Sequence, residues 1–439
     1  MVLAVHVLTC LLGTGSWVAI NGMWVELPLI VPRAPEGWYL PSYLTVLIQL
    51  ANVGPLVVTL AHRFRPGRLS EVGTIYAILG VGIVACLLLA FLWQETSLVG
   101  GAPHSTALLS LLFFLALVDC TSSVTFLPYM RRLRAHYLTT YFVGEGLSGL
   151  LPGLVALGQG VGVAHCVNGS LAAGNGTRLR EEDQPARFSV QSFFLFLGGM
   201  MGLCLAAFFL LDRLPVARQE RAKEKYQAQA RVEPGTGLSA TMEERPMIGN
   251  PEGPGPGSTF GTGTYSRPQV VFIFLVLAWV NALTNAVLPA VQSYSCLPYG
   301  NGAYHLSATL AAVANPLACF LGMFLPSRSL VAMGVLAAAG TGFSFYIMAM
   351  AVLSPCPPLL DSPAGVTLIV LCWVLFVGIL SYVKLMIGLV LRDEGHSALV
   401  WCGAVVQLGS MVGALVMFPL VNVYGLFHSG DSCNNSCPR

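Results

Sequence analysis

Eleven long apolar segments constrain this chain more than any other feature of its sequence. Hydrophobic residues make up 55% and charged residues 10% of the 439 positions, far from the composition of a soluble domain. In lipid every backbone polar group must be paired within the protein, so only helices and closed barrels span membranes. Continuous apolar runs of about 20 residues, rather than short alternating ones, select helices. The sequence therefore predicts an all-α polytopic membrane protein with eleven transmembrane helices, at about 4–27, 40–62, 72–93, 105–130, 137–165, 188–211, 268–292, 303–325, 329–353, 364–391 and 397–424.

Weak matches between the first and second parts of the chain share one offset of about 260 residues. Asn21 in the first predicted helix corresponds to Asn281 in the seventh, and a proline follows each of them. The second and eighth helices share Asn52 and Asn315, and similar matches join the fourth helix to the tenth and the fifth to the eleventh. Such a pattern is typical of an internally duplicated transporter, with chance similarity between apolar helices as the alternative. We predict a 6+5 pseudo-repeat.

A polar segment separates the two parts of this repeat. Residues 212–267 turn first basic and then rich in glycine and proline, a composition that cannot bury enough apolar surface to fold. We therefore expect an N-terminal six-helix bundle at 1–211, a disordered cytoplasmic linker at 212–267, a C-terminal five-helix bundle at 268–424 and an extracellular tail at 425–439.

The distribution of arginine predicts the orientation of the chain. Basic residues follow the second, fourth, eighth and tenth predicted helices, for example Arg63, Arg131, Arg328 and Arg392. The short loops on the opposite side contain no Lys or Arg, at 94–104, 293–302 and 354–363. Since basic loops remain cytoplasmic, we expect the amino terminus inside and the carboxyl terminus outside. The first helix has no basic residue before it, so we do not expect it to be a cleaved signal peptide.

Glycosylation signals and cysteines fall on the predicted outer side. Three Asn-x-Ser/Thr sequons offer Asn168, Asn175 and Asn434 as acceptors. Five of the twelve cysteines also lie in outer segments, where an oxidising compartment favours disulfides. A bridge from Cys433 or Cys437 to Cys356 would tether the carboxyl-terminal tail to the loop between the ninth and tenth helices, and the sequence leaves the pairing open.

Several functional classes lack their sequence signature. We find no phosphate-binding Walker loop, no His-Glu-x-x-His motif and no clustered His/Cys spacing within a helix. The formal net charge is +2 and the basic residues are spread over loops, so no nucleic-acid surface is predicted. We expect neither an enzyme nor a metal or cofactor site. The lipid bilayer is the expected surrounding, and the sequence does not identify any protein partner.

Few ionisable side chains lie inside the predicted helices. Asp119, Glu145 and Lys384 are the clear cases, with Glu26 near the outer end of the first helix. Charges in hydrocarbon are costly and tend to face a cavity or a partner. Lys384 either extends to the cytoplasmic surface or pairs with Glu145 or Asp119 across the two halves, as a gate that opening would break.

Uncharged polar residues are more numerous inside the helices. Single ones usually join neighbouring helices by hydrogen bonds. Their concentration on helices one, two, four, seven, eight and ten, together with Trp24, instead favours a cavity that hydrogen-bonds a neutral solute and stacks on its flat part. Prolines 28, 289 and 316 are either hinges for alternating access or simple packing kinks.

Several strings resemble the vertebrate riboflavin transporters, solute carrier family 52. They are WVAINGMWVELP at 17–28, PEGWYLPSY at 35–43, NALTN at 281–285 and SYSCLPYG at 293–300, with DCTSS at 119–123 and FVGEG at 142–146 in addition. The resemblance covers nearly the whole chain except the linker, and it is closest to the third, intestinal-type member.

The resemblance implies uptake of riboflavin across the plasma membrane, independent of sodium and favoured by mildly acid outside pH. It also implies an eleven-helix fold related to the major facilitator and equilibrative nucleoside transporters. A nucleoside or other heteroaromatic solute carrier is the alternative within transport. A cell-surface receptor with incidental transport is the alternative from another class.

The ligand contacts are predicted on helices of both halves. A flavin ring needs stacking and amide partners, and its ribityl chain needs hydroxyl and amide partners. We expect contacts from Asn21, Trp24, Gln49, Asp119, Thr284, Asn285 and Tyr382, with Glu145 and Lys384 as a gate or coupling pair.

Overall fold

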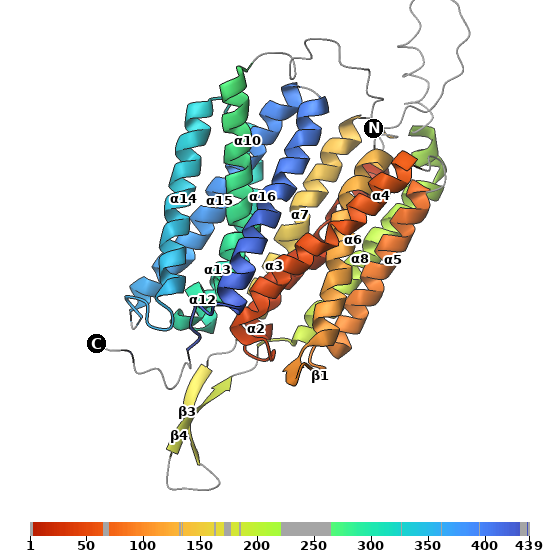
Figure 1. Ribbon diagram of the computed structural model, residues 1–439. Helices are drawn as coiled ribbons and strands as arrows, with labels where there is room; N and C mark the ends of the chain where they lie inside the picture. Colours follow the sequence, from red (N-terminus) through yellow and green to blue (C-terminus); the bar gives the residue numbers. More distant parts are fainter. Residues whose placement is uncertain are drawn as a thin grey trace, which may run out of the picture.

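The computed structural model describes residues 3–64, 70–130, 133, 135–161, 164–170, 177–183, 186–220, 265–325, 327–360, 362–394, 396–430 and 437. Most of the predicted linker, the sequons at Asn175 and Asn434, and Cys433 lie outside these residues. Asn168 lies in a described strand. Within the described part the chain is a tilted bundle of helices with two short hairpins at one end (Figure 1).

The predicted all-helical membrane fold is confirmed. Among the described residues, ten helices are long and apolar enough to cross a membrane, or eleven when the bent pair at the amino terminus counts as one span. In chain order the spans are α1 Leu3–Thr14 with α2 Val18–Ile30, α3 Leu40–Ala51 with α4 Val53–Phe64, α5 Glu71–Leu92, α6 Thr106–Met130, α7 Ala135–Gln159, α8 Val190–Arg213, α10 Arg267–Ala282 with η2 Leu283–Val287 and α11 Leu288–Ala290, α13 Asn301–Phe324, α14 Leu330–Val352, α15 Pro363–Glu394 and α16 His396–Asn422.

Two predicted spans differ in detail from the structure. The first is broken: α1 and α2 meet at a bend of 51°. The bend lies at Gly15–Trp17, not at Pro28, which sits inside α2. The fifth span was predicted to reach residue 165 but ends at Gln159, because Gly160 takes a left-handed backbone with φ of +66° and strand β3 begins at Ala164.

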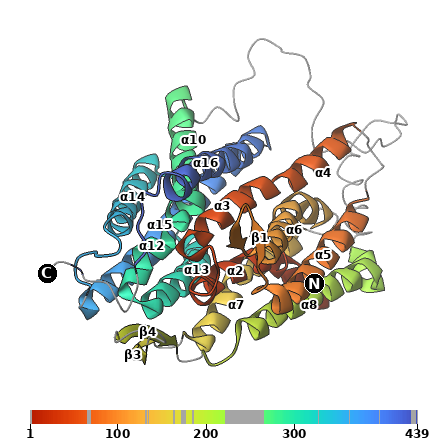
Figure 2. The ribbon, with the colours of Figure 1, turned by 60° about the horizontal axis from the view of Figure 1, so that its bottom comes forward.

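Helix packing in the first part of the chain recurs in the second. The pairs α1 with α7, α3 with α6 and α5 with α6 correspond to α10 with α16, α13 with α15 and α14 with α15. Figure 2 shows α3–α8 on one side of the bundle and α10–α16 on the other. Helix α8 packs on α5 and α1 in the first half, and the five spans of the second half supply no counterpart to it.

Glycines allow the same close approach at corresponding places in both halves. Gly13 and Gly144 bring α1 against the backbone of α7, where an added Cβ would collide with the carbonyls of Tyr141 and Cys10. Gly409 and Gly413 do the same between α16 and the carbonyls of α10. Small residues at helix contacts are how membrane helices gain van der Waals packing, since lipid supplies no hydrophobic drive for their association.

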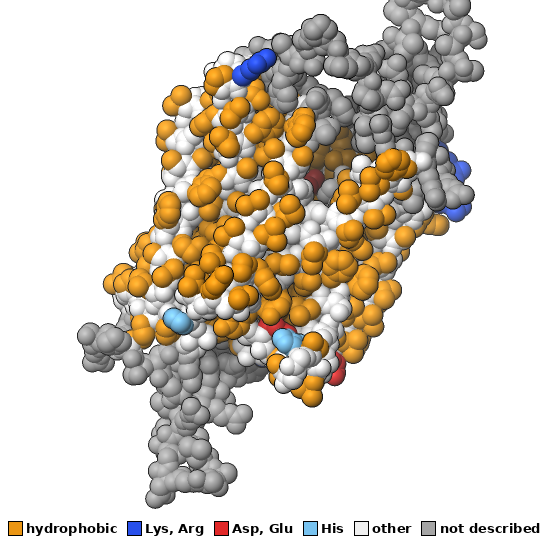
Figure 3. Space-filling view, viewed as in Figure 1, with side chains coloured by type: hydrophobic (Ala, Val, Ile, Leu, Met, Phe, Trp, Pro, Cys, Tyr) orange, Lys and Arg blue, Asp and Glu red, His pale blue; other side chains and the backbone are white. Residues whose placement is uncertain are grey.

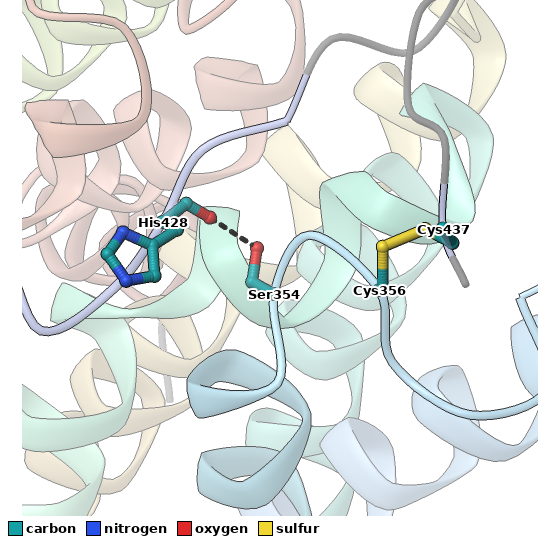
Figure 4. The surroundings of a disulfide bond; sticks show 4 residues. All are labelled: Ser354, Cys356, His428 and Cys437. Atoms are coloured by element: carbon teal, nitrogen blue, oxygen red, sulfur yellow. Dashed lines mark hydrogen bonds between the residues drawn. A yellow bond between two sulfur atoms is a disulfide. The ribbon is translucent and has the colours of Figure 1, made fainter.

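The two ends of the bundle differ. The hairpin end carries β1 Ser97–Val99 with β2 Ala102–His104, β3 Ala164–Ser170 with β4 Thr177–Asp183, and the carboxyl-terminal residues. There a disulfide joins Cys356 to Cys437, with a Cα–Cα distance of 5.6 Å, and Ser354 Oγ donates to the His428 carbonyl at 2.6 Å (Figure 4). The linker end carries the start of α1, the end of α8 and the start of α10 (Figure 1). The two termini thus lie at opposite ends, as an odd number of spans requires.

Candidate substrate cavity

Residues 3–220 and 265–437 close on each other at the hairpin end. Ser293 Oγ donates to the Trp38 carbonyl at 2.6 Å, and Asn422 Nδ2 donates to Ser42 Oγ at 2.7 Å. The ring of Trp38 also packs edge-on against Tyr294, with centroids 5.6 Å apart. These contacts, with His305 Nε2 at 2.9 Å from the Ala156 carbonyl, form what we call the hairpin-end seal.

Toward the linker end the two halves diverge. Helix α16 packs against α3, whereas α4, which continues the second span, packs against α6. In Figure 1 the linker-end parts of α4 and α16 point away from each other. Figure 3 shows the surface hollowed between them, with an acidic side chain inside the hollow and apolar side chains over most of the face in view. Among the described residues the halves are therefore in contact at the hairpin end, and the hollow between them lies toward the linker end.

A π-helix in the seventh span presents one group of polar side chains to this region. Residues Leu283–Val287 form the π-turn, in which the Leu288 amide bonds the Leu283 carbonyl. Pro289 explains it, because a proline ring clashes with the carbonyl four residues earlier and has no N–H to pair with it. The wider turn interrupts the regular helix at Thr284 and Asn285, both half-buried.

These side chains form a connected network. Asn285 Nδ2 donates to Asn281 Oδ1 at 3.2 Å and to Ser410 Oγ of α16 at 3.0 Å. Thr284 Oγ1 donates to the Val280 carbonyl at 2.9 Å and accepts from Lys384 Nζ of α15 at 3.2 Å. We call Asn281, Thr284, Asn285, Lys384 and Ser410 the π-helix cluster. It joins three helices and contains one cation.

The first half contributes Asn21 and Trp24 from α2. Asn21 Nδ2 donates to Ser148 Oγ of α7 at 3.2 Å, and Gly149 of α7 lies close both to Asn21 and to the Ala312 carbonyl of α13. Asn21 therefore lies where the two halves meet. Trp24 is half-buried one turn further along α2.

A second amide group lies midway along the second span, where α3 meets α4. Asn52, at the junction of α3 and α4, donates through Nδ2 to Gln407 Oε1 of α16 at 3.1 Å and lies 3.4 Å from Gln49 Oε1. This contact also joins the two halves. The side-chain amides of Asn52, Gln49 and Gln407 are hydrogen-bonded to one another, so a solute would have to replace these bonds.

Asp119 has a different place from the one its prediction as a ligand contact implies. It is 0% exposed, and its Oδ2 accepts from the backbone N–H of Ile20 at 2.9 Å. That amide belongs to the first turn of α2, whose N–H groups have no helical partner. Ser122 supports the same break by donating to the Ser16 carbonyl at 3.0 Å. Its carboxyl group caps the new helix end and is shielded from solvent, and its role as a ligand contact stays a prediction.

Tyr382 lies apart from the amide groups, and Lys384 belongs to the π-helix cluster without pairing with Glu145 in the described part of the chain. Tyr382 OH donates to the Leu325 carbonyl at 2.6 Å, where α13 ends at the linker end. Lys384 bonds Thr284, and no ion pair joins it to Glu145 among the described residues. Cys319 of α13 lies close to both charged groups. A gate contact forms in only one state of a transporter, so its absence from this state does not test the predicted Glu145–Lys384 pair. The pair remains a prediction.

Two groups that sequence patterns did not reveal are the π-turn and the buried His305. Only a proline four residues after Asn285 signals the π-turn, and a single histidine in α13 signals nothing until its partner on α7 is known.

Cys296, one of the outer cysteines, is free and buried beside Ser295 and Trp373, and burial raises the pKa of its thiol to about 11. It is thus an unreactive packing residue.

Comparison with protein families gives a match over nearly the whole chain. A family model described as solute carrier family 52, riboflavin transporter, matches residues 1–429. Riboflavin transporter 2 of Salmo salar and riboflavin transporter member 3-B of Danio rerio are each 64% identical to this chain, over 100% of both chains. Member 3 of Homo sapiens is 53% identical, again over 100% of both.

Solved structures share the fold at low identity. A POT family transporter in complex with 5-aminolevulinic acid aligns with a TM-score of 0.57 and 10% identity, covering 96% of this chain and 90% of that one. A mutant of the nucleoside transporter NupG aligns with a TM-score of 0.52 and 11% identity, covering 96% and 92%. Such identities show the fold alone, which is of the major facilitator type. The full-length match to the family and to relatives more than half identical shows that this chain belongs to solute carrier family 52, the riboflavin transporters.

Proposed function

We propose that this chain takes up riboflavin across the plasma membrane by alternating access. The observation that carries the proposal is one cavity, faced by uncharged amides and hydroxyls from both halves, in a chain whose relatives are named riboflavin transporters. We also propose that uptake is independent of sodium and favoured by acid outside pH, as the family resemblance implies.

The chemistry of the cavity suits a flavin. The isoalloxazine ring has a flat face and an edge of alternating carbonyls and ring nitrogens, and the ribityl chain has four hydroxyls. Asn285, Asn21 and Gln49 offer amides that can both donate and accept, while Trp24 offers a face for stacking. Thr284 adds a hydroxyl held beside the Lys384 cation. We propose Asn21, Trp24, Gln49, Thr284 and Asn285 as ligand contacts.

The orientation follows from charge. The arginines described near the linker end include Arg213 and Arg267, and basic segments remain cytoplasmic. We propose that the hairpin end faces outward, so that the cavity opens to the cytoplasm in this structure. Uptake then requires the hairpin-end seal to break and the halves 1–211 and 268–424 to close at the linker end. Glu145 and Lys384, which lie on different halves near Cys319, are proposed to meet in that closed-inside state.

Uptake of radiolabelled riboflavin tests the ligand site. Thr284→Ala and Asn285→Ala should raise the apparent KM about tenfold, as expected for a lost hydrogen bond to a buried polar ligand group. Thr367→Ala is a matched control, because Thr367 also donates to the carbonyl four residues earlier but faces outward on α15. Surface abundance is measured in parallel. Unchanged uptake by both variants of the π-helix cluster would remove that span from the site.

Competition separates the alternatives. Excess lumiflavin should block uptake of riboflavin, whereas excess uridine should not. Block by uridine and not by lumiflavin would favour a nucleoside carrier. A receptor role would be favoured by ligand binding that survives loss of Asn285 and Thr284 but not deletion within 166–187.

A further inference from the structure

One buried carboxyl group has no part in the proposed ligand site. Glu26 lies on α2 near the hairpin end and is 0% exposed. Its Oε1 accepts a hydrogen bond at 3.0 Å from Nε2 of Gln159, the last residue of α7, which is also 0% exposed. Gln159 Nε2 also lies 3.3 Å from the Phe188 carbonyl. Two polar side chains are thus sealed against each other inside the first half.

The same contact leaves two oxygens without partners. Glu26 Oε2 and Gln159 Oε1 are both buried, and neither has a hydrogen-bond partner among the residues that the structure describes. Both are acceptors when Glu26 is ionised, so they cannot satisfy each other. A carboxylic acid and a primary amide pair through two hydrogen bonds when the acid is protonated. A single proton on Glu26 Oε2, donated to Gln159 Oε1, would therefore satisfy both atoms.

The surroundings do not supply another counter-charge. Arg33, beyond the end of α2, is the cation that acts on Glu26, at a distance and without an ion pair in the described part of the chain. Arg187 is engaged with the Gly158 carbonyl at 3.1 Å. Of the titratable groups on the elements packed against α2, Asp119 of α6 and Glu145 of α7 lie toward its other end, and Asp212 and Arg213 lie at the linker end of α8. His305 and Tyr304 of α13 lie toward the hairpin end. An ionised carboxylate buried with one amide donor is strongly disfavoured, and such a group takes up a proton instead.

The pair lies against the hairpin-end seal. His305 meets the carbonyl of Ala156, which is one turn before Gln159 on α7. When the halves part at this end, His305 leaves α7 and water reaches the end of that helix. We propose that Glu26 with Gln159 is a proton-binding site, which takes a proton from the outer solution as the hairpin end closes. Outer acid then favours the closing step, and the proton returns to the same side when the seal reopens.

The experiment uses the full-length transporter and compares initial uptake of riboflavin at outer pH of about 6 and about 7.5. The proposed function supplies this readout. Glu26→Gln imitates the protonated acid, so its uptake should agree at the two pH values within about 1.5-fold, whereas the wild type should fall several-fold toward neutral pH. The exchanged double variant, Glu26→Gln with Gln159→Glu, restores one acid and one amide and should regain the pH dependence.

The outcomes are distinct. A Glu26→Gln transporter that keeps the wild-type pH dependence overturns the proposal, and so does a flat profile that the exchanged variant does not restore. Infrared spectra of purified protein at neutral pH give a second readout, because a protonated carboxyl band present in the wild type should be missing from Glu26→Gln. Absence of any difference in that band also overturns it. If the wild type carried no riboflavin, the proposed function would fail while the infrared comparison still decided the proton site.

Discussion

The first and seventh spans occupy equivalent places in the two halves, yet they interrupt their helices in different ways. The first is cut at Gly15–Trp17, and the amide of Ile20 in the new helix α2 is bound by the buried carboxylate of Asp119. The seventh stays helical and widens into the π-turn at Leu283–Val287. A break exposes helix-end N–H groups, which only an acceptor from another helix can satisfy in lipid, whereas a π-turn keeps most backbone bonds and redirects side chains.

The difference assigns separate tasks to the two spans. In the first, the carboxyl group of Asp119 is fully buried and holds α2 in position, so Asn21 and Trp24 depend on it indirectly. In the seventh, Thr284 and Asn285 are half-buried, are hydrogen-bonded within the π-helix cluster, and are themselves proposed as ligand contacts. Equivalent places in a repeat therefore need not hold equivalent chemistry.

The largest effect is expected at Asp119. Asp119→Leu leaves the Ile20 amide without an acceptor inside the membrane, a loss of about 2–3 kcal/mol for a buried donor left unpaired. We expect the melting temperature of the purified protein to fall by several degrees and surface abundance with it. Asp119→Asn keeps an acceptor oxygen and should retain a large part of both. Wild-type stability in Asp119→Leu would break the contrast drawn between the two spans.

Charge reversal tests the cation of the π-helix cluster. Lys384→Glu and Glu145→Lys should each reduce uptake by about 30-fold, because each leaves like charges facing one cavity at a cost of ~2 kcal/mol. The double reversal should recover part of that loss if the two groups meet in the closed-inside state. Uptake by the double variant no better than by the worse single one would count against their contact.

Asn281 and Asn285 separate stability from binding within the seventh span. Asn281 is buried and donates to the Leu277 carbonyl, so Asn281→Ala should lower the melting temperature. Asn285→Ala should leave the melting temperature nearly unchanged and raise KM about tenfold. The opposite pattern would show that Asn285 supports the helix and that the solute contacts lie elsewhere.

The smallest effect is expected where the halves meet midway. Asn52→Ala or Gln407→Ala removes one neutral hydrogen bond, worth about 1 kcal/mol, and should change the apparent KM by no more than about fivefold. A double-mutant cycle on the pair should give a coupling of similar size. Independent, additive effects would show that the 3.1 Å contact does not contribute to the balance between states.

Sequence patterns predicted the spans well because apolar length is a local property. They located the fifth span with an error only at its end, where Gly160 turns the chain. They did not locate the break in the first span, because Pro28 is tolerated inside α2 while the small residues Gly15 and Ser16 carry the bend. For Asp119 the sequence shows only an acidic residue within an apolar helix. A helix cap and a ligand contact both require such a residue, so the sequence does not distinguish them.

The sequence by itself determined the membrane fold, the number of spans, the family and a set of polar side chains with few charges among them. Tertiary structure alone decided which of these side chains are hydrogen-bonded to other helices and which face a cavity. The reason is physical: hydrophobic length acts within one segment, whereas a buried polar atom takes its role from whichever partner another helix brings within about 3 Å. Glu26 with Gln159 and Asp119 with Ile20 are both contacts between residues about 100 or more positions apart.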